Sequence, residues 1–196
     1  MSERDENLQT FLDAARTAYE EFAQAPQSQR SIGRIFAALE NPGTVRQATG
    51  TRLPVCEHLD AALSVEVPHP SLQRLIAQFK AIEPQLEWRR RPTYDGTASE
   101  NFPDGHANAM IVGPGGLEER RDLWLGVTLM APYVRYPDHN HAPEEVYLVL
   151  SEGEFRQGEG DWFSPGIGGS FYNVPQIRHA MRSLETPLFA FWALSA

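Results

Sequence analysis

The chain has 196 residues, of which 41% are hydrophobic and 22% are charged, an ordinary composition for a globular protein with a sizeable core. Its net charge of −9 argues against nucleic acid as the main partner, and no stretch approaches the roughly 20 apolar residues that span a membrane. Cys56 is the single cysteine, which excludes an intramolecular disulfide, and the charged residues 1–6 lack the apolar core of a signal peptide, so we expect a cytoplasmic protein.

The first 86 residues are predicted to be mainly helical. Apolar residues recur at helical spacing over residues 7–23, 31–40 and 71–82. Pro26 is expected to end the first helix, and Ser71 is expected to cap the third. The apolar stripes predict core positions. We therefore expect a helical N-terminal extension, residues 1–86, that packs on a second domain or forms the contact of a homodimer.

From residue 87 the pattern changes to short segments in which β-branched and aromatic residues alternate with polar ones. The predicted strands cover residues 107–112, 122–135, 144–150, 154–156, 161–164, 170–174, 178–183 and 187–194. Turns rich in glycine and proline separate them. Several short antiparallel strands with tight turns indicate a barrel or a sandwich. The expected fold is mainly β, with a β-barrel domain over residues 87–196.

The residues that carry chemistry gather in one motif, H-x-H-x3-E, with a later histidine. Its members are His139, His141, Glu145 and His179. Residues two apart on an extended segment point to the same face, so the first two histidines should share a face. Three imidazoles and one carboxylate form a complete ligand set for one divalent transition metal. The sequence therefore predicts a metal held inside the β-barrel.

The alternative without a metal is that residues 138–141 form a solvated polar loop and that His179 is a hydrogen-bonded core histidine. It leaves unexplained why Glu145 opens an otherwise apolar strand, because a buried carboxylate is costly unless it is paired or bound to a metal. Mixed nitrogen and oxygen ligands admit Zn, Fe(II), Mn, Ni, Co or Cu, and we favour zinc or iron.

The motif resembles that of the cupin superfamily. Its first motif has two histidines and a glutamate followed by a glycine, and Gly153 fits that place one residue late. Its second motif has proline, glycine and histidine; this chain keeps Pro175 and His179 but lacks the glycine and is one residue shorter. The resemblance covers about residues 107–194. It implies a double-stranded β-helix barrel that binds a metal.

A narrower resemblance rests on two tyrosines, Tyr136 and Tyr147, that flank the first motif, and on Val-Pro-x3-His-Ala behind a helical N-terminal part. In these features the chain is similar to the bacterial cupin dimethylsulfoniopropionate (DMSP) lyases of the DddQ type. That family cleaves DMSP to dimethyl sulfide and acrylate. The resemblance implies that His139, His141, Glu145 and His179 hold the metal and that both tyrosines are catalytic.

This chemistry suits the residues. A lyase of this kind removes a proton next to a carboxylate, and a phenol beside a cation has a lowered pKa that favours the phenolate. Tyr147 lies two residues after Glu145, so we expect it beside the metal as the base, with Tyr136 as a rival base or an orienting group. Aromatic faces could hold the sulfonium group. The candidates are Trp124, Tyr133 and Trp192.

Two other functions fit the same ligands. A cupin Fe(II)-dependent dioxygenase acting on a small carboxylate would require oxygen and would give the two tyrosines no joint role. A metal-dependent binding protein would require a ligand but no base. A lyase acting on DMSP, with no nucleic acid or membrane as partner, is the favoured hypothesis.

Overall fold

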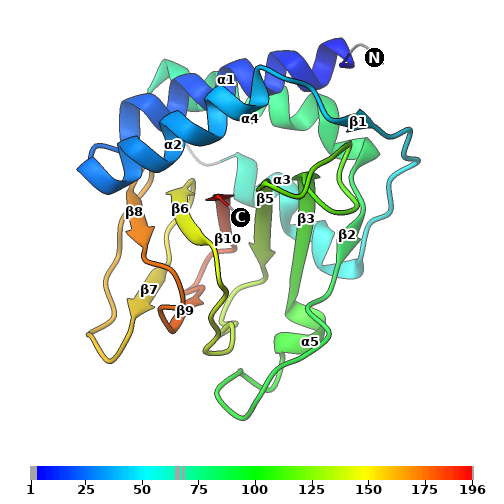
Figure 1. Ribbon diagram of the computed structural model, residues 1–196. Coiled ribbons are helices and arrows are strands. Elements are labelled where there is room, and N and C mark those ends of the chain that lie inside the picture. The colour runs from blue at the N-terminus through cyan, green and yellow to red at the C-terminus, as the bar shows by residue number, and fades with distance from the viewer. Residues whose placement is uncertain (1–3, 65–66, 68, 196) are drawn as a thin grey trace.

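The computed structural model describes residues 4–64, 67 and 69–195 (Figure 1), so residues 1–3 of the charged N-terminal segment lie outside the described residues. The helices are α1 (Glu6–Phe22), α2 (Pro26–Leu39), α3 (Leu59–Leu63), α4 (Pro70–Ile82) and α5 (Phe102–Gly105), with 3-10 turns η1 (Pro54–His58) and η2 (Glu83–Gln85). The strands are β1 (Thr44–Val45), β2 (Trp88–Arg89), β3 (His106–Val112), β4 (Glu118–Glu119), β5 (Leu123–Met130), β6 (Glu144–Val149), β7 (Glu154–Gln157), β8 (Ser170–Asn173), β9 (His179–Arg182) and β10 (Leu188–Ser195).

The helix starts follow local chemistry. Asp5 caps α1 by accepting hydrogen bonds from the first free backbone N–H groups. Pro26, expected only to end the first helix, begins α2, and α4 begins at Pro70 with His69 rather than Ser71 as its cap. Both corrections have one reason: proline has a fixed φ and no N–H, which suits the first helical position.

The strands form two sheets. The larger has eight strands in the order β1-β4-β3-β5-β10-β6-β8, with β2 paired to β3, and the smaller consists of β7 and β9. α1, α2 and α4 lie together as one layer against the larger sheet (Figure 1). The mainly-β fold with N-terminal helices is therefore the one predicted. Among the described residues, no helix is long and apolar enough to cross a membrane.

Alternation along the central strands gives the larger sheet two faces. On β10, Phe189 and Phe191 face the helices, where the Phe79 ring of α4 lies 5.2 and 5.4 Å from theirs. We call this helix-covered side the outer face. Trp192 and Leu194 belong to the opposite side, the inner face, where they line a cavity. The apolar stripes of the helices are thus taken up by the core of the chain itself, as predicted for core positions.

Two predicted strands differ from the structure. Residues 161–164 contribute only an isolated bridge between Phe155 and Phe163. The strand predicted over residues 122–135 ends at Met130, because Pro132 has no N–H to donate and Tyr133 adopts a φ of 58°.

Strands β1, β2 and β4 were not predicted, because they have two residues each, which is too short for a periodic signal. The domain boundary at residue 86 stays a prediction.

Candidate metal centre

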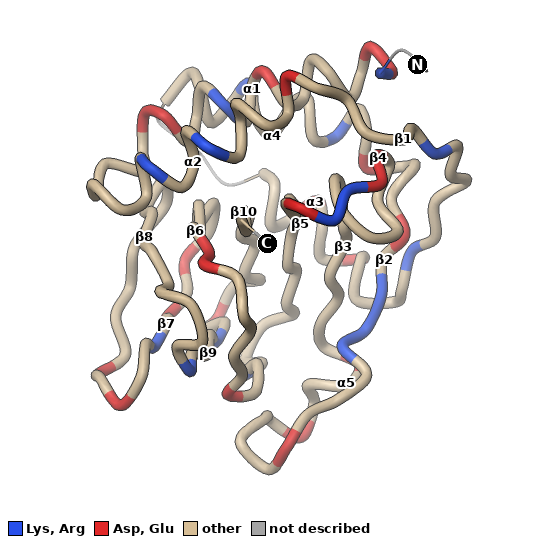
Figure 2. The backbone as a smooth tube through the Cα atoms, in the orientation of Figure 1, with Lys and Arg blue, Asp and Glu red and all other residues tan. Residues whose placement is uncertain are grey.

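Strand register places the acidic start of β6 beside the aromatic residues of the inner face. Glu145 pairs with Leu194 of β10 and with Asn173 of β8, and Tyr147 pairs with Trp192. In Figure 2 the acidic start of β6 stands out against β5 and β10, which carry no charged residue. One buried carboxylate therefore lies beside two central strands that carry no charged residue.

The two parts of the motif meet through backbone hydrogen bonds. The His139 N–H donates to the His179 carbonyl at 3.0 Å, and the His179 N–H donates to the His139 carbonyl at 2.8 Å. The Gln176 N–H also donates to the His141 carbonyl at 2.9 Å. This two-sided bridge fixes the loop before β6 against the start of β9, so residues distant in sequence meet at one point.

Ligand atoms of three predicted residues gather there. One atom each from His141, Glu145 and His179 lies within 4.8 Å of the others. Oε2 of Glu145 is 3.3 Å from Nε2 of His141 and 3.3 Å from Nε2 of His179. The fourth predicted ligand, His139, lies at their edge, with its ring centroid 4.1 Å from that of His179.

The three histidines are held in the same way. In each ring, Nδ1–H donates a hydrogen bond to the backbone carbonyl oxygen of a residue two positions away in sequence. This bond fixes the orientation of the ring. The acceptors are Pro137 for His139 at 2.9 Å, Pro143 for His141 at 2.9 Å and Ile177 for His179 at 3.0 Å. A histidine whose Nδ1–H is bound to a carbonyl presents an Nε2 lone pair, the usual arrangement of a metal ligand.

These residues fit a cation. The buried Nε2 of His179 has no hydrogen-bond partner, although it lies next to the Glu145 carboxylate. A lone pair facing a carboxylate oxygen is unfavourable unless a positive charge lies between them. Burial alone would raise the pKa of Glu145, but positive charge and hydrogen bonds from the two imidazoles beside it hold that pKa well below its usual range, so the carboxylate is ionised where a cation lies next to it. Burial lowers the pKa of His139 to about 3, so this imidazole is neutral and able to bind a metal.

A cavity of about 210 Å³ opens on this group. Its wall includes both predicted tyrosines and two of the predicted aromatic contacts, Trp124 and Trp192. The structure does not bring Tyr133 there: its side chain is 68% exposed. Tyr133 lies in the turn after β5 with a left-handed φ of 58°, and it is not among the residues that line the cavity.

The two tyrosines lie in different parts of this wall. Tyr147 is 2% exposed and stacks on Phe171 with ring centroids 5.0 Å apart. Burial raises the pKa of Tyr147 well above 10, and the Glu145 carboxylate adds to the rise. Tyr136 lies 4.9 Å from the His139 ring; burial raises its pKa, and the Arg91 guanidinium opposes that rise.

The sequence did not point to several polar residues of the site. Asn108 and Thr128 line the cavity, and Asn173 donates to Oε2 of Glu145 at 2.9 Å. A polar residue inside an apolar strand was the available signal for Asn108 and Thr128. Arg91, which also lines the cavity, follows two other arginines and gave no signal.

A buried aspartate anchors the histidine loop from behind. Asp138, whose side chain is 3% exposed, binds Arg135 at 2.8 Å and both Arg156 and Arg178 at 2.7 Å. Because three arginines converge on the carboxylate next to His139, they hold the backbone of that histidine in place.

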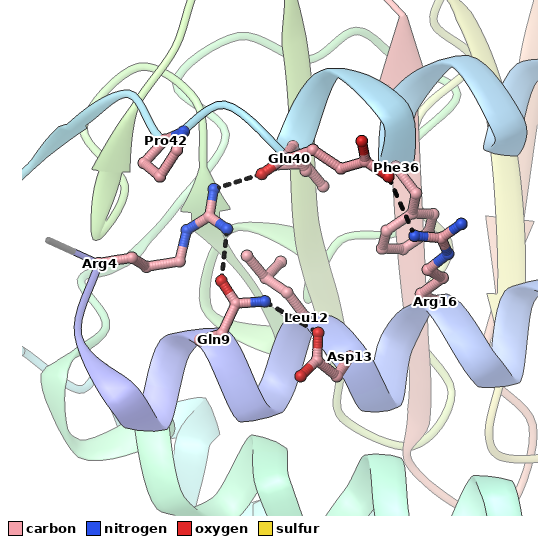
Figure 3. Close-up of a pocket in the computed structure, with 9 residues that line it drawn as sticks. Arg4, Gln9, Leu12, Asp13, Arg16, Phe36, Glu40 and Pro42 are labelled. Atoms are coloured by element: carbon pink, nitrogen blue, oxygen red, sulfur yellow. Dashed lines mark hydrogen bonds and ion pairs between the residues drawn. The ribbon is translucent and has the colours of Figure 1, made fainter.

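A larger cavity, of about 320 Å³, lies between α1 and α2 (Figure 3). Its polar groups bind each other: Arg4 donates to Gln9 at 2.7 Å, and Gln9 donates to Asp13 at 2.8 Å. Arg4 also binds the buried Glu118 carboxylate at 2.6 Å. We interpret these polar contacts as structural: they hold the start of α1 against the sheet.

Comparison with known proteins agrees with this geometry. A family model of dimethylsulfoniopropionate lyases matches residues 27–190. The DMSP lyase DddQ of Ruegeria pomeroyi is 29% identical over 160 residues, which cover 79% of this chain and 76% of the relative.

Two solved structures extend the likeness over almost the whole chain. One, described as crystal structures of the DMSP lyases RdDddP and RnDddQII, has 25% identity and a TM-score of 0.72, covering 97% of this chain and 92% of that chain. DddQ from Ruegeria pomeroyi DSS-3 has 22% identity and a TM-score of 0.73, covering 98% and 92%, a likeness in fold. The mainly β fold with a helical N-terminal extension, predicted from the sequence, is thus the fold of this protein and is shared with these lyases. Because the family model spans most of its length, this chain belongs to the DMSP lyase family.

Proposed function

We propose that this protein cleaves DMSP to dimethyl sulfide and acrylate at a single divalent metal. His141, Glu145 and His179 would hold the metal, with His139 as the fourth ligand. Membership of the DMSP lyase family supports the reaction. The observation that carries the proposal is the gathering of three ligand atoms within 4.8 Å, at a cavity that two buried tyrosines line.

The donor set suits a borderline metal, and zinc or iron(II) is proposed. A divalent metal bound there supplies a Lewis acid that neutralises the substrate carboxylate and favours the negative charge that develops as the adjacent proton leaves. Asn173, through its hydrogen bond to Glu145, holds the carboxylate of the site in one orientation.

Tyr147 is proposed as the base that takes the α proton. Its ring lines the cavity and is fixed by Phe171, so the phenol oxygen has little freedom to move. The Glu145 carboxylate raises the pKa of Tyr147 while its charge is uncompensated, so a phenolate requires the metal-loaded site. As the proton moves to Tyr147, the C–H electron pair forms the double bond of acrylate, and the bond to sulfur breaks to release neutral dimethyl sulfide.

The rest of the cavity suits a small zwitterion. Its volume of about 210 Å³ lies below the roughly 300–1,000 Å³ of pockets for drug-sized ligands. Trp124 and Trp192 are proposed to hold the sulfonium group, with roughly 0.5–2 kcal/mol for each cation–π contact. Arg91 lines the same cavity, where it would attract the carboxylate end. Tyr136 is proposed as a rival base or an orienting group.

The proposal includes a cytoplasmic location. The buried, free Cys56 supports it, because the protein has no need of an oxidising compartment to complete a disulfide.

The test is headspace gas chromatography of purified, metal-analysed protein mixed with DMSP, with and without oxygen. We expect dimethyl sulfide and acrylate in equal amounts in both conditions, and none after removal of the metal. Consumption of substrate only in the presence of oxygen would indicate an Fe(II)-dependent dioxygenase. Metal-dependent binding of DMSP without turnover would indicate a binding protein.

A further inference from the structure

A chain of hydrogen bonds crosses the inner face of the barrel and ends on Tyr136. Nε1 of Trp192 lies 3.1 Å from Oγ1 of Thr128, and that oxygen lies 2.6 Å from Oδ1 of Asn108. Nδ2 of Asn108 in turn lies 3.1 Å from the Tyr136 hydroxyl oxygen. The register of β3 and β5 makes Asn108 and Thr128 direct neighbours, and all four side chains line the cavity.

The chain has a direction. An indole N–H can only donate, so Thr128 accepts from Trp192. The 2.6 Å between Thr128 and Asn108 is shorter than an ordinary N–H···O bond but usual for O–H···O, so the threonine hydroxyl donates to the amide oxygen. The amide nitrogen of Asn108 must then face the tyrosine. Its distance of 3.1 Å suits an N–H···O bond.

The direction decides what Tyr136 can do. Its oxygen accepts a hydrogen bond from Asn108, so the proton of the neutral phenol cannot point back along the chain. The ring is 4% exposed and is held edge-on by Phe102 at 5.0 Å and by His106 at 5.5 Å. Since the ring cannot swing away and Tyr136 lines the cavity, the hydroxyl proton is left to point into the cavity.

We propose that Asn108, oriented by Thr128 and Trp192, is a positioning residue that keeps the Tyr136 hydroxyl as a hydrogen-bond donor into the cavity. The inference rests on the proposed lyase function, in which a donor there meets the substrate carboxylate. It makes Tyr136 the orienting group and leaves the proton transfer to Tyr147. It also gives the Trp192 N–H a task separate from any contact of its ring with the sulfonium group.

The first test replaces the donor by an acceptor of nearly the same size. In Asn108→Asp, the carboxylate can only accept, so it captures the Tyr136 proton and withdraws it from the cavity. We expect kcat for DMSP cleavage to fall about 100-fold, at the low end of the cost of losing one oriented donor, while metal content and KM change less than about twofold. Asn41→Asp, the same change at an exposed position outside the cavity, should leave kcat unaltered. An unchanged kcat in Asn108→Asp would overturn the proposal.

A double-mutant cycle distinguishes positioning from a structural effect. If Asn108 acts through the Tyr136 hydroxyl, then adding Asn108→Asp to Tyr136→Phe should lower kcat less than about twofold further. Thr128→Val keeps the shape but removes the hydroxyl that orients the amide, and it should cost about 10-fold in kcat with Tyr136 present and little with Tyr136→Phe. Effects that multiply in the double variants would contradict the role.

A third measurement needs no turnover. In the zinc-loaded protein, the side-chain amide resonance of Asn108 is the one that Asn108→Asp removes. We expect this resonance to shift in both Tyr136→Phe and Thr128→Val, because each takes away one of its partners. An unshifted resonance overturns the hydrogen-bonded chain. If the unmodified protein releases no dimethyl sulfide, the proposed function fails, and this spectrum alone decides the placement of Asn108.

Discussion

The two faces of the larger sheet are made by the same strands but do opposite things. On β6, Glu144 faces α2 and binds Arg34 at the surface, whereas the next residue, Glu145, enters the inner face and is only 3% exposed. The outer face buries aromatic side chains against three helices and carries stability. The inner face buries a carboxylate, histidines and tyrosines, which are costly there unless they bind something. Because consecutive residues of a strand point to opposite faces, a shift of one residue decides whether a side chain contributes to stability or to the site.

The largest effect should come from the two neighbouring glutamates. Glu145→Ala removes a proposed ligand, so we expect loss of bound metal and a fall in DMSP turnover of about 1,000-fold, which corresponds to about 4 kcal/mol in the activation free energy. Glu144→Ala is the matched control, and it should keep both metal and turnover. Metal analysis and dimethyl sulfide release measure the pair. Equal losses of bound metal and turnover in the two variants would contradict the assignment of different roles to the two faces.

The outer face should respond in stability alone. Phe79 is fully buried and makes edge-on contacts with Phe189 and Phe191, so Phe79→Ala should lower the free energy of unfolding by about 3–5 kcal/mol. Well below the unfolding transition, turnover per folded molecule should stay within about twofold. Urea unfolding and dimethyl sulfide release measure the two quantities. A large fall in turnover of the folded protein would tie the helical layer to the site.

Two buried tyrosines on opposite sides of β6 sharpen the comparison. Tyr147→Phe should keep the metal and the fold but lose about 100-fold or more in kcat, the contribution of a positioned base. Tyr19, on the outer face, donates a hydrogen bond to the Val146 carbonyl at 3.4 Å. Tyr19→Phe should therefore cost only about 1 kcal/mol in stability and leave kcat unchanged. Near-normal turnover in Tyr147→Phe would take that residue out of its role as base.

The smallest effect is a dependence of the free energy of unfolding on pH, which we expect from the buried residue His106. His106 accepts a hydrogen bond from the Arg91 N–H at 2.8 Å, and burial lowers its pKa to about 4. In the unfolded chain the His106 imidazole has a pKa near 6.5, so it is protonated at a pH where the folded protein keeps it neutral. The free energy of unfolding should therefore decrease as pH falls from about 6.5 to 4. The expected loss is roughly 2–3 kcal/mol.

Urea unfolding of the metal-free protein at pH 7.5 and 4.5 measures this loss, with His106→Gln as the comparison. The variant should be less stable at pH 7.5 but should lose less on acidification. His139 contributes equally to both proteins, so the difference in slope belongs to His106. Parallel slopes would show that its protonation is not linked to folding.

The outer face was the easier to predict, because its signal is periodicity. Stripes such as Leu8, Phe11 and Leu12 on α1 repeat at the spacing of a helix, and the structure buries them as expected. The longer strands were found by alternation, but the strand predicted over residues 122–135 ends five residues earlier, at Met130. The turn at Tyr133 arises from one left-handed residue after a proline, which alternation does not encode.

The gathering of three possible ligand residues was predictable because chemistry and spacing coincide: His141 and Glu145 are close in sequence, and only His179 had to be joined from another strand. The partners that hold these residues were not predictable. Asn108 reaches Tyr136 from a strand about thirty residues earlier, and the arginines on Asp138 come from three separate segments. Such contacts depend on register between strands, which a single sequence does not state.

The central claim is that one metal on the inner face drives the cleavage of DMSP. The direct measurement is a titration of metal-free protein with zinc or iron(II), without oxygen, while dimethyl sulfide release is followed. The rate should rise in proportion to added metal and level off at one metal per chain, and Glu145→Ala should give no rise at all. A rate that is independent of metal, or absent at every metal loading, would contradict the account.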